Sequence, residues 1–103
     1  MERRRSKRGK AGHPLIDSVE PVMFGVIRLV FDDGYEAVLD LRPLMTRTIW
    51  KNVRTKEDFF AVEIEEYGHH LSWPAGNGLA ELPADGLRRN CEHQEKLHAS
   101  MYE

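Results

Sequence analysis

The sequence contains only one cysteine and no long apolar run, which argues against a disulfide-stabilised protein and against a membrane-spanning one. Cys91 has no second cysteine with which to form an internal disulfide, a pattern typical of the reducing cytoplasm. No apolar stretch approaches the roughly 20 residues that span a bilayer, and no apolar segment follows the basic N-terminus, as a secretory signal requires. We therefore expect a cytoplasmic protein with no membrane partner.

The charge of the chain is unevenly distributed. The formal net charge is −2, but residues 1–10 hold six basic residues and one acidic residue, +5 in sum, so residues 11–103 carry −7. Residues 1–13 contain almost nothing to bury, which favours a disordered basic arm. We predict one globular domain over residues 14–90 and a C-terminal helical extension or frayed tail over residues 91–103.

The stretch from Gly25 to Leu44 predicts a β-hairpin that runs into a short helix. A three-residue loop over residues 32–34 pairs Phe31 with Tyr35, whereas a two-residue loop would set apolar residues against charged ones. Such a loop ends in a left-handed residue, a conformation that suits Gly34. The shared apolar face then consists of Ile27, Leu29, Phe31, Tyr35, Ala37, Leu39 and Leu41.

One strand and two short helices are predicted on either side of this hairpin. The stretch Leu15–Val22 predicts a first strand, and Pro21, which has no N–H to donate, indicates that this strand either lies at a sheet edge or ends there. Asp40 is positioned to cap a short helix that begins with the next residue. Thr55 opens a second short helix, in which Asp58 completes a variant of the capping box.

The second half of the chain predicts another hairpin and a third helix. Residues 61–73 form the hairpin, and a two-residue loop, Tyr67-Gly68, sets Ile64 opposite Leu71. Residues 74–78 are a loop by composition, and a helix that starts at Pro83 follows. The predicted fold class is therefore α+β: a small single domain of antiparallel hairpins, with about five strands and two or three short helices.

Four short motifs occur in order along the predicted domain: Ser18–Pro21, Leu29–Gly34, Leu39–Leu44 and Leu71–Gly76. Their order and spacing resemble a bacterial family, the domain of unknown function 2442, over residues 17 to about 88. The resemblance implies a small α+β fold, no established catalytic residue, and a small partner protein in an arrangement like a toxin–antitoxin pair. Some members carry an added DNA-binding domain. The basic arm and the tail after Leu87 depart from the family's short form.

An acidic run, Glu63, Glu65 and Glu66, has the residue type for general acid–base work or for binding a divalent cation. Alternation places Glu63 and Glu65 on the wet face of the second hairpin, so we interpret the run as a solvated strand face. We predict no catalytic residue, because no converging set of reactive groups is visible.

A zinc site would need about four converging ligands, and the available residues do not have a recognised spacing. The neighbours His69 and His70 point to opposite faces of a strand, so only one of them can join a site. Cys91 and His93 diverge by about 200° on a helix and form no nucleophile–base pair. With His98 also weighed as a ligand, we predict no metal site and no cofactor.

The residues that we expect to bind a partner are Trp50, Glu63 and Glu65. An acidic face steers a basic partner, and an aromatic anchor beside it supplies affinity. Trp50 lies in an irregular segment, residues 45–54, and has no assigned face, so we expect it to be partly exposed. The predicted function is a non-enzymatic protein-interaction or regulatory module, a component of a pair of the toxin–antitoxin kind.

The alternative is a nucleic-acid-binding protein that uses the basic arm. Its cations would contact phosphates and give salt-dependent affinity with no sequence preference. No aromatic residue interleaves them, so base stacking is not expected. A solubilising leader with no ligand also fits the composition. The arm residues are Arg3, Arg4, Arg5, Lys7, Arg8 and Lys10.

Overall fold

The computed structural model describes residues 14–74 and 80–101, with side chains up to residue 98. The predicted basic arm and most of the predicted loop over residues 74–78 therefore lie outside the described residues.

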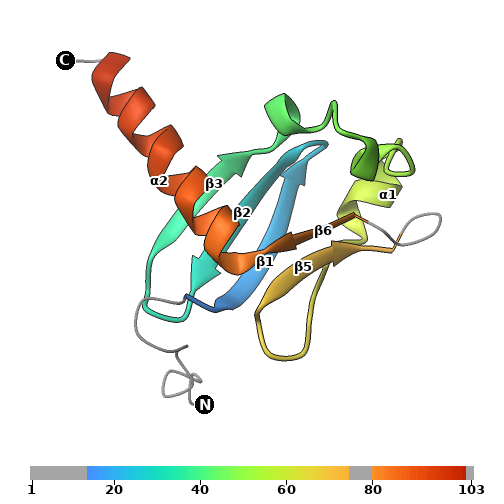
Figure 1. The fold of residues 1–103 in the computed structure, drawn as a ribbon, viewed down its shortest axis with the longest axis horizontal. Helices are drawn as coiled ribbons and strands as arrows, with labels where there is room; N and C mark the ends of the chain where they lie inside the picture. Colours follow the sequence, from blue (N-terminus) through green and yellow to red (C-terminus); the bar gives the residue numbers. More distant parts are fainter. Residues whose placement is uncertain (1–13, 75–79, 102–103) are drawn as a thin grey trace.

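The fold is built from two three-stranded antiparallel sheets, A and B (Figure 1). Sheet A has the order β1 (Ile16–Met23), β2 (Val26–Phe31), β3 (Glu36–Asp40), and sheet B the order β4 (Glu63–Ile64), β5 (His70–Trp73), β6 (Ala80–Pro83). The 3-10 turns η2 (Arg42–Leu44) and η3 (Thr48–Trp50) and the helix α1 (Lys56–Phe60) connect the sheets, and α2 (Ala84–Met101) follows sheet B.

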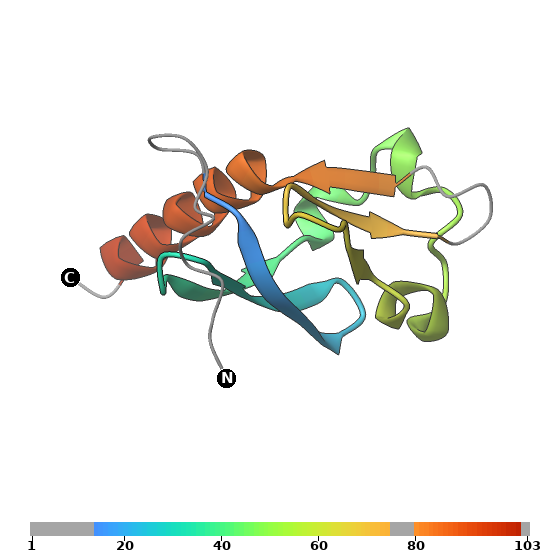
Figure 2. The ribbon, with the colours of Figure 1, turned by 90° about the horizontal axis from the view of Figure 1, so that it is seen from below.

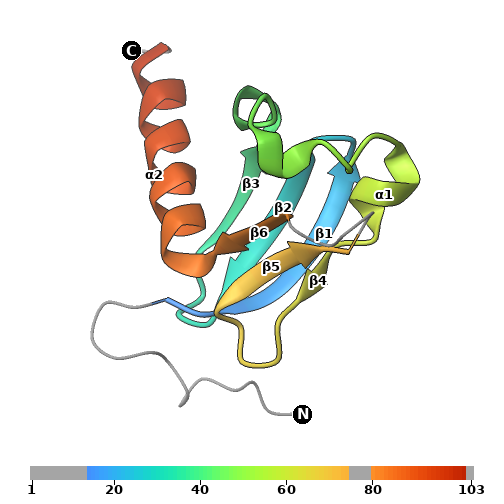
Figure 3. The same cartoon turned by 45° about the vertical axis from the view of Figure 1, so that its right-hand side comes forward.

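The two sheets lie one in front of the other, and α2 runs beside β3 (Figures 2 and 3). The predicted α+β class is confirmed, with six strands in the described residues in place of about five. The helices are not all short, because α2 has 18 residues and continues without a break through Cys91.

The β2–β3 hairpin has the predicted register. Ile27 faces Leu39 and Leu29 faces Ala37 across the two strands. The Phe31 N–H donates to the Tyr35 carbonyl at 2.8 Å, which closes a three-residue loop. Gly34 in that loop has a φ of +93°, the left-handed conformation that the loop type requires.

All three predicted helices are present, and two of them begin one residue later than predicted. The third starts at Ala84, because Pro83, its predicted first residue, is the last residue of β6. The first helix is a 3-10 turn that begins at Arg42, one residue later than predicted, and the Asp40 carboxylate accepts the Arg42 N–H at 3.0 Å. The capping box of α1 is complete: Thr55 Oγ1 accepts the Asp58 N–H at 3.1 Å, and Asp58 Oδ2 accepts the Thr55 N–H at 3.1 Å. Pro21 lies within β1, an edge strand, which is one of its two predicted positions.

Sheet B departs from the prediction in two respects. Ile64 faces Leu71 as predicted, but the turn lies one residue earlier, because the Gly68 N–H donates to the Glu65 carbonyl at 2.8 Å. The strand β6 was not predicted, since its four residues end in Pro83 and are too few to distinguish an alternating strand from a loop. Its register beside β5 pairs Trp73 with Ala80.

The inner faces of both sheets and the first half of α2 enclose one core. Trp73 lies at its centre: its indole Nε1–H donates to the Phe59 carbonyl at 2.9 Å, and its ring stacks on Phe59 with 5.6 Å between ring centroids. The fully buried large side chains are Ile16, Ile27, Leu29, Phe31, Leu39, Leu41, Phe59, Leu71, Trp73, Leu87 and Cys91.

Polar contacts hold α2 against the hairpin of sheet A. The Arg88 guanidinium lies 4.0 Å from the Tyr35 ring centroid and forms an ion pair with Asp33 at 3.1 Å. Further along the helix, Gln94 donates to the Asp40 carbonyl at 2.9 Å and accepts the Asp40 N–H at 3.1 Å. These contacts explain why the helix continues beyond Cys91, where its apolar pattern weakens.

Candidate protein-binding face

The outer face of sheet B carries a row of polar side chains. Ser72 on the central strand faces Glu63 on one side and Glu81 on the other. Both glutamates are exposed, and their backbones are two strand spacings apart, about 10 Å. Neither carboxylate has an ion-pair partner among the described residues, so the negative charge of this face is uncompensated there.

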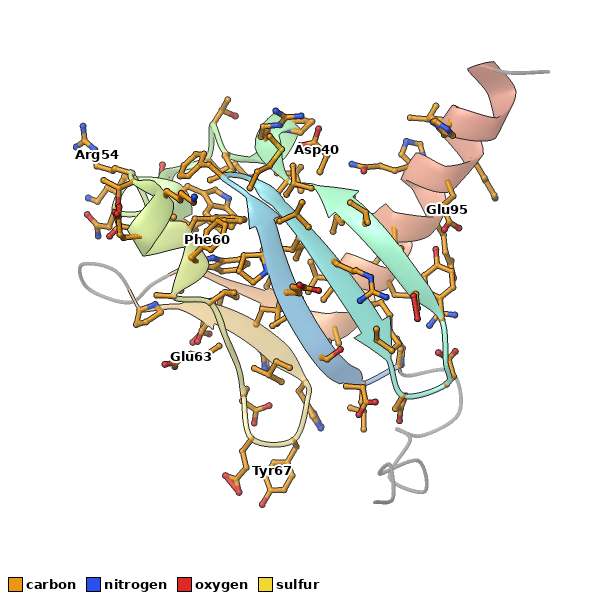
Figure 4. The ribbon with its side chains drawn as sticks, turned by 180° about the vertical axis from the view of Figure 1, so that it is seen from behind. Asp40, Arg54, Phe60, Glu63, Tyr67 and Glu95 are labelled. Carbon is orange, nitrogen blue, oxygen red and sulfur yellow. The ribbon has the colours of Figure 1, made fainter. Side chains whose placement is uncertain are left out.

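The β4–β5 turn extends this face with an exposed aromatic ring. The Glu65 carboxylate holds the turn, because it accepts the N–H groups of His69 at 3.1 Å and of Tyr67 at 3.4 Å. The Tyr67 side chain is 62 % exposed and touches the His69 ring edge-on, with 6.3 Å between centroids. Figure 4 shows Tyr67 at the tip of the hairpin, pointing away from both sheets, and Glu63 at the same side of the molecule.

Of the residues predicted to bind a partner, one is exposed on this face and another is buried in the core. Glu63 is exposed, as predicted. Trp50 is only 3 % exposed, so the prediction of a partly exposed anchor is wrong. Its ring packs edge-on against Trp73, 4.9 Å between centroids, because η3 folds back onto the core from a segment that showed no periodicity. Glu65 is half-buried and serves the turn.

The histidines and the cysteine do not assemble. In the described ranges, no three side chains of His, Cys, Asp or Glu come close enough together to hold a metal ion. Cys91 lies on the buried face of α2, and burial raises the pKa of its thiol to about 11. A thiol with this pKa is protonated at neutral pH, so Cys91 behaves as a small apolar core residue.

Two residues of the face escaped prediction from sequence. Tyr67 was assigned to the turn, but the exposure of its ring was not predicted; the large aromatic residue between Glu66 and Gly68 was the available signal, since turns favour small polar residues. Glu81 was missed together with β6. The alternation of Ala80, Glu81 and Leu82 contained the signal, but three residues are too few to separate a strand from a loop.

Comparison with known proteins identifies no relative of this chain. No family model, no curated protein and no solved structure matches this chain. The resemblance to the domain of unknown function 2442 therefore stays a prediction. None of the helices in the described part of the chain is long and apolar enough to cross a membrane.

Proposed function

We propose that this protein is a non-enzymatic protein-interaction module that binds a basic partner protein through the outer face of sheet B. A single observation carries the proposal: the hairpin that presents the exposed ring of Tyr67 at its tip belongs to a sheet whose outer face carries Glu63 and Glu81, two carboxylates with no ion-pair partner among the described residues. The surface thus offers an aromatic anchor and a charge of one sign.

The carboxylates and the aromatic ring of this face contribute to different steps of binding. Carboxylates such as Glu63 and Glu81 raise the rate at which a basic partner arrives, but solvent and salt screen their contribution to affinity. Affinity requires apolar area that becomes buried, and tyrosine is among the residues that most often dominate an interface. Tyr67 therefore takes the role that the sequence pattern suggested for Trp50.

The partner we propose is a small protein encoded beside this one, as in a toxin–antitoxin pair. The support for this part is the four-motif resemblance alone, and a regulatory role follows from the same resemblance. We place the complex in the cytoplasm, because the chain has one cysteine.

The experiment is a capture from the native host with the neighbouring genes intact, using the full chain as bait. Tyr67→Ala should reduce the recovered partner about tenfold or more, which is the usual loss at an interface hot spot. The matched control is Leu97→Ala, which also removes an exposed apolar side chain (53 % exposed), but from α2. Equal recovery by both variants would contradict the proposed face.

The charged row is tested with the purified partner. Glu63→Lys combined with Glu81→Lys should slow association about tenfold at low salt and flatten its salt dependence. Glu57→Lys with Glu20→Lys makes the same change in net charge at exposed sites on α1 and β1. An association rate that falls equally in both double variants would show that only the overall charge matters.

Nucleic-acid binding by the basic arm is the alternative proposal. It is supported by the six cations of residues 3–10, which lie outside the described residues. Deletion of residues 1–10 should abolish retention of nucleic acid at low salt, and equal retention by the deleted and full chains would remove this alternative.

A further inference from the structure

A second group of basic residues lies inside the folded domain. Residues 41–56 contain five cations, Arg42, Arg47, Lys51, Arg54 and Lys56, and no acidic residue. Since residues 11–103 sum to −7, the remainder of that range carries −12. The longest acid-free basic segment of the domain therefore stands out against a strongly acidic background.

One of the five cations is neutralised within the fold. The Arg42 guanidinium donates two hydrogen bonds of 2.9 Å to the two carboxylate oxygens of Asp40. The other four, which we call the cationic ridge, are all exposed and form no ion pair with any residue that the structure describes. The cationic ridge consists of Arg47, Lys51, Arg54 and Lys56.

The backbone under the ridge is held in place by turns and by buried anchors. Successive N–H groups donate to carbonyls three residues earlier, from Trp50 to Arg47 at 3.0 Å and from Val53 to Trp50 at 2.9 Å. Trp50 and Val53 are both buried, 3 % and 4 % exposed. The side chains of Arg47, Lys51 and Arg54 therefore project from a fixed backbone, which lowers the entropy lost when they bind a ligand.

Two acidic residues follow the ridge in sequence, and one of them is already engaged. Asp58 Oδ2 accepts the N–H groups of Arg54 at 3.0 Å and Thr55 at 3.1 Å, which keeps this carboxylate at the start of α1. Glu57 is exposed and reduces the local positive charge beside Lys56. The N–H groups of Arg54 and Thr55 lower the pKa of the Asp58 carboxyl, and the nearby Arg54 guanidinium lowers it further, so this carboxylate keeps its charge close to Arg54. The positive charge least offset by nearby acidic residues is therefore that of Arg47 and Lys51.

The Arg54 end of the ridge lies on the side of the molecule away from α2. In Figure 1 the connection starts at η2, directly after β3, and runs along one edge of the molecule to α1 on the side opposite α2; in Figure 4 the labelled Arg54 points away from the body. Exposed cations such as Arg89 and Lys96 lie on a different element, α2, and can serve as controls.

We propose that the cationic ridge binds the phosphate backbone of nucleic acid. The ridge offers lysine ammonium groups and arginine guanidinium groups on an open surface, and both can contact phosphate oxygens. The exposed Thr48, which follows Arg47 in sequence, adds a hydroxyl donor. The nearby aromatic ring, Phe60, is half-buried with Lys56 over it, 5.2 Å from the Nζ atom to the ring centroid, so it is not free to stack on a base. The ridge therefore binds without reading sequence.

The test measures binding of the full chain to a fluorescent DNA duplex of mixed sequence, about 20 base pairs long, from about 50 to about 200 mM salt. The ridge variant combines Arg47→Gln, Lys51→Gln and Arg54→Gln. Loss of three phosphate contacts should reduce the slope of log K against log salt by about 2 to 3 and weaken binding about tenfold or more at the lowest salt.

The matched control combines Arg28→Gln, Arg89→Gln and Lys96→Gln, which changes the net charge by the same amount at exposed sites away from the ridge. It should bind within about twofold of wild type, with an unchanged slope. Equal weakening of the two triple variants would overturn the proposal, because it would reflect overall charge. Absence of binding by the wild-type chain would also overturn it.

Further variants distinguish the ridge from the N-terminal arm and from self-association. Deletion of residues 1–10 that abolishes binding, together with a ridge variant that binds as wild type, would assign the contact to the arm and overturn the ridge. Arg47→Lys with Arg54→Lys should keep binding within about threefold of wild type, since phosphate contact needs the charge. Self-association in sedimentation without DNA, lost only in the ridge variant, would instead make a second copy the ligand and overturn the proposal.

Discussion

The β2–β3 loop and the β4–β5 turn each contain a left-handed glycine, as the β1–β2 turn also does at Gly25, yet the glycines of these two turns have different surroundings. Gly34 in the β2–β3 loop has a φ of +93°, and Gly68 in the β4–β5 turn has a φ of +81°. A Cβ atom at Gly34 would meet nothing within 4 Å, whereas one at Gly68 would lie 2.6 Å from the Ile16 carbonyl oxygen. The torsion angle explains the preference for glycine, and the surroundings determine the cost of replacing it.

The difference follows from where each turn lies. Gly34 forms the tip of the β2–β3 loop, which we call the free tip because a Cβ atom there would meet no neighbour. The loop beside it is tied down, since the Asp32 N–H donates to the Leu15 carbonyl at 2.9 Å and Asp33 pairs with Arg88. The β4–β5 turn is a joint between the two sheets, because the Ile16 N–H at the start of β1 donates to the Gly68 carbonyl at 2.8 Å. A side chain at Gly68 would separate the backbones that this hydrogen bond joins. The same turn also carries Tyr67, so the joint fixes the position of the proposed anchor.

The largest effect should come from Gly68→Ala. The unfavourable φ and the collision with the β1 backbone together should lower the free energy of unfolding by about 3 kcal/mol or more. Urea denaturation at equilibrium measures it. The control is Gly86→Ala in α2, where the added Cβ meets Pro83 at 3.5 Å and the helix gains about 0.5–1 kcal/mol. If Gly68→Ala lowered the free energy of unfolding no more than a substitution of Gly34 does, the contact between the β4–β5 turn and β1 would not constrain Gly68.

Gly34→Val should have an intermediate effect. The added side chain meets no neighbour, so the cost is that of placing a β-branched residue in the left-handed region, about 1–2 kcal/mol. Gly34→Asn should cost less, because asparagine tolerates this conformation. The same urea experiment measures both variants, and equal costs for valine and asparagine would show that backbone conformation is not the cause.

This comparison also shows what local sequence can predict. The β2–β3 register followed from two local features, the alternation around Phe31 and Tyr35 and the glycine at the end of the loop. Gly68 was placed in a turn for the same kind of reason. Its contact with Ile16, 52 positions earlier in the chain, left no local pattern, so the stronger constraint on Gly68 was not predictable.

The errors at the candidate site have the same origin. Trp50 was expected outside because its segment has no periodicity, but its burial depends on Trp73, which is distant in sequence. The exposure of Glu63 was predicted correctly, since strand alternation is local. That of Glu81 was not, because β6 exists only through its pairing with β5. Contacts between elements decided each residue that the sequence misplaced.

A smaller effect is expected from Arg88→Met, which removes the charge of the side chain and keeps most of its length. Arg88 lies over the rings of Tyr35 and Phe31, at 4.0 and 5.1 Å from their centroids, and pairs with Asp33 beside the free tip. The loss should be about 1 kcal/mol, since these contacts are partly exposed. Arg89→Met, at an exposed position one residue along, should change stability little; an equal loss in both would remove the special role of Arg88.

The smallest effect is a dependence of stability on pH at the free tip. Burial acts to raise the pKa of Asp33, but the Tyr35 N–H at 3.1 Å and the Arg88 guanidinium outweigh it, and the pKa of this carboxyl is lowered. A carboxyl whose folded pKa lies below its unfolded value, about 3.9, stabilises the fold above that pH.

This contribution should be lost as the pH falls below about 4 and through the folded pKa of Asp33. Because the side chain is 33 % exposed, solvent screening limits the effect to about 0.5 kcal/mol or less. Wild type and Asp33→Asn, compared by urea denaturation from about pH 6 to about pH 2.5, should differ at the upper end and converge at the lower end. In an Arg88→Met background the difference should shrink at every pH, because the cation that lowers the pKa of Asp33 is gone. A constant difference between wild type and Asp33→Asn across the whole range would show that the tip is held by its backbone geometry alone, as Gly34 is, and that the charge of Asp33 adds nothing to it.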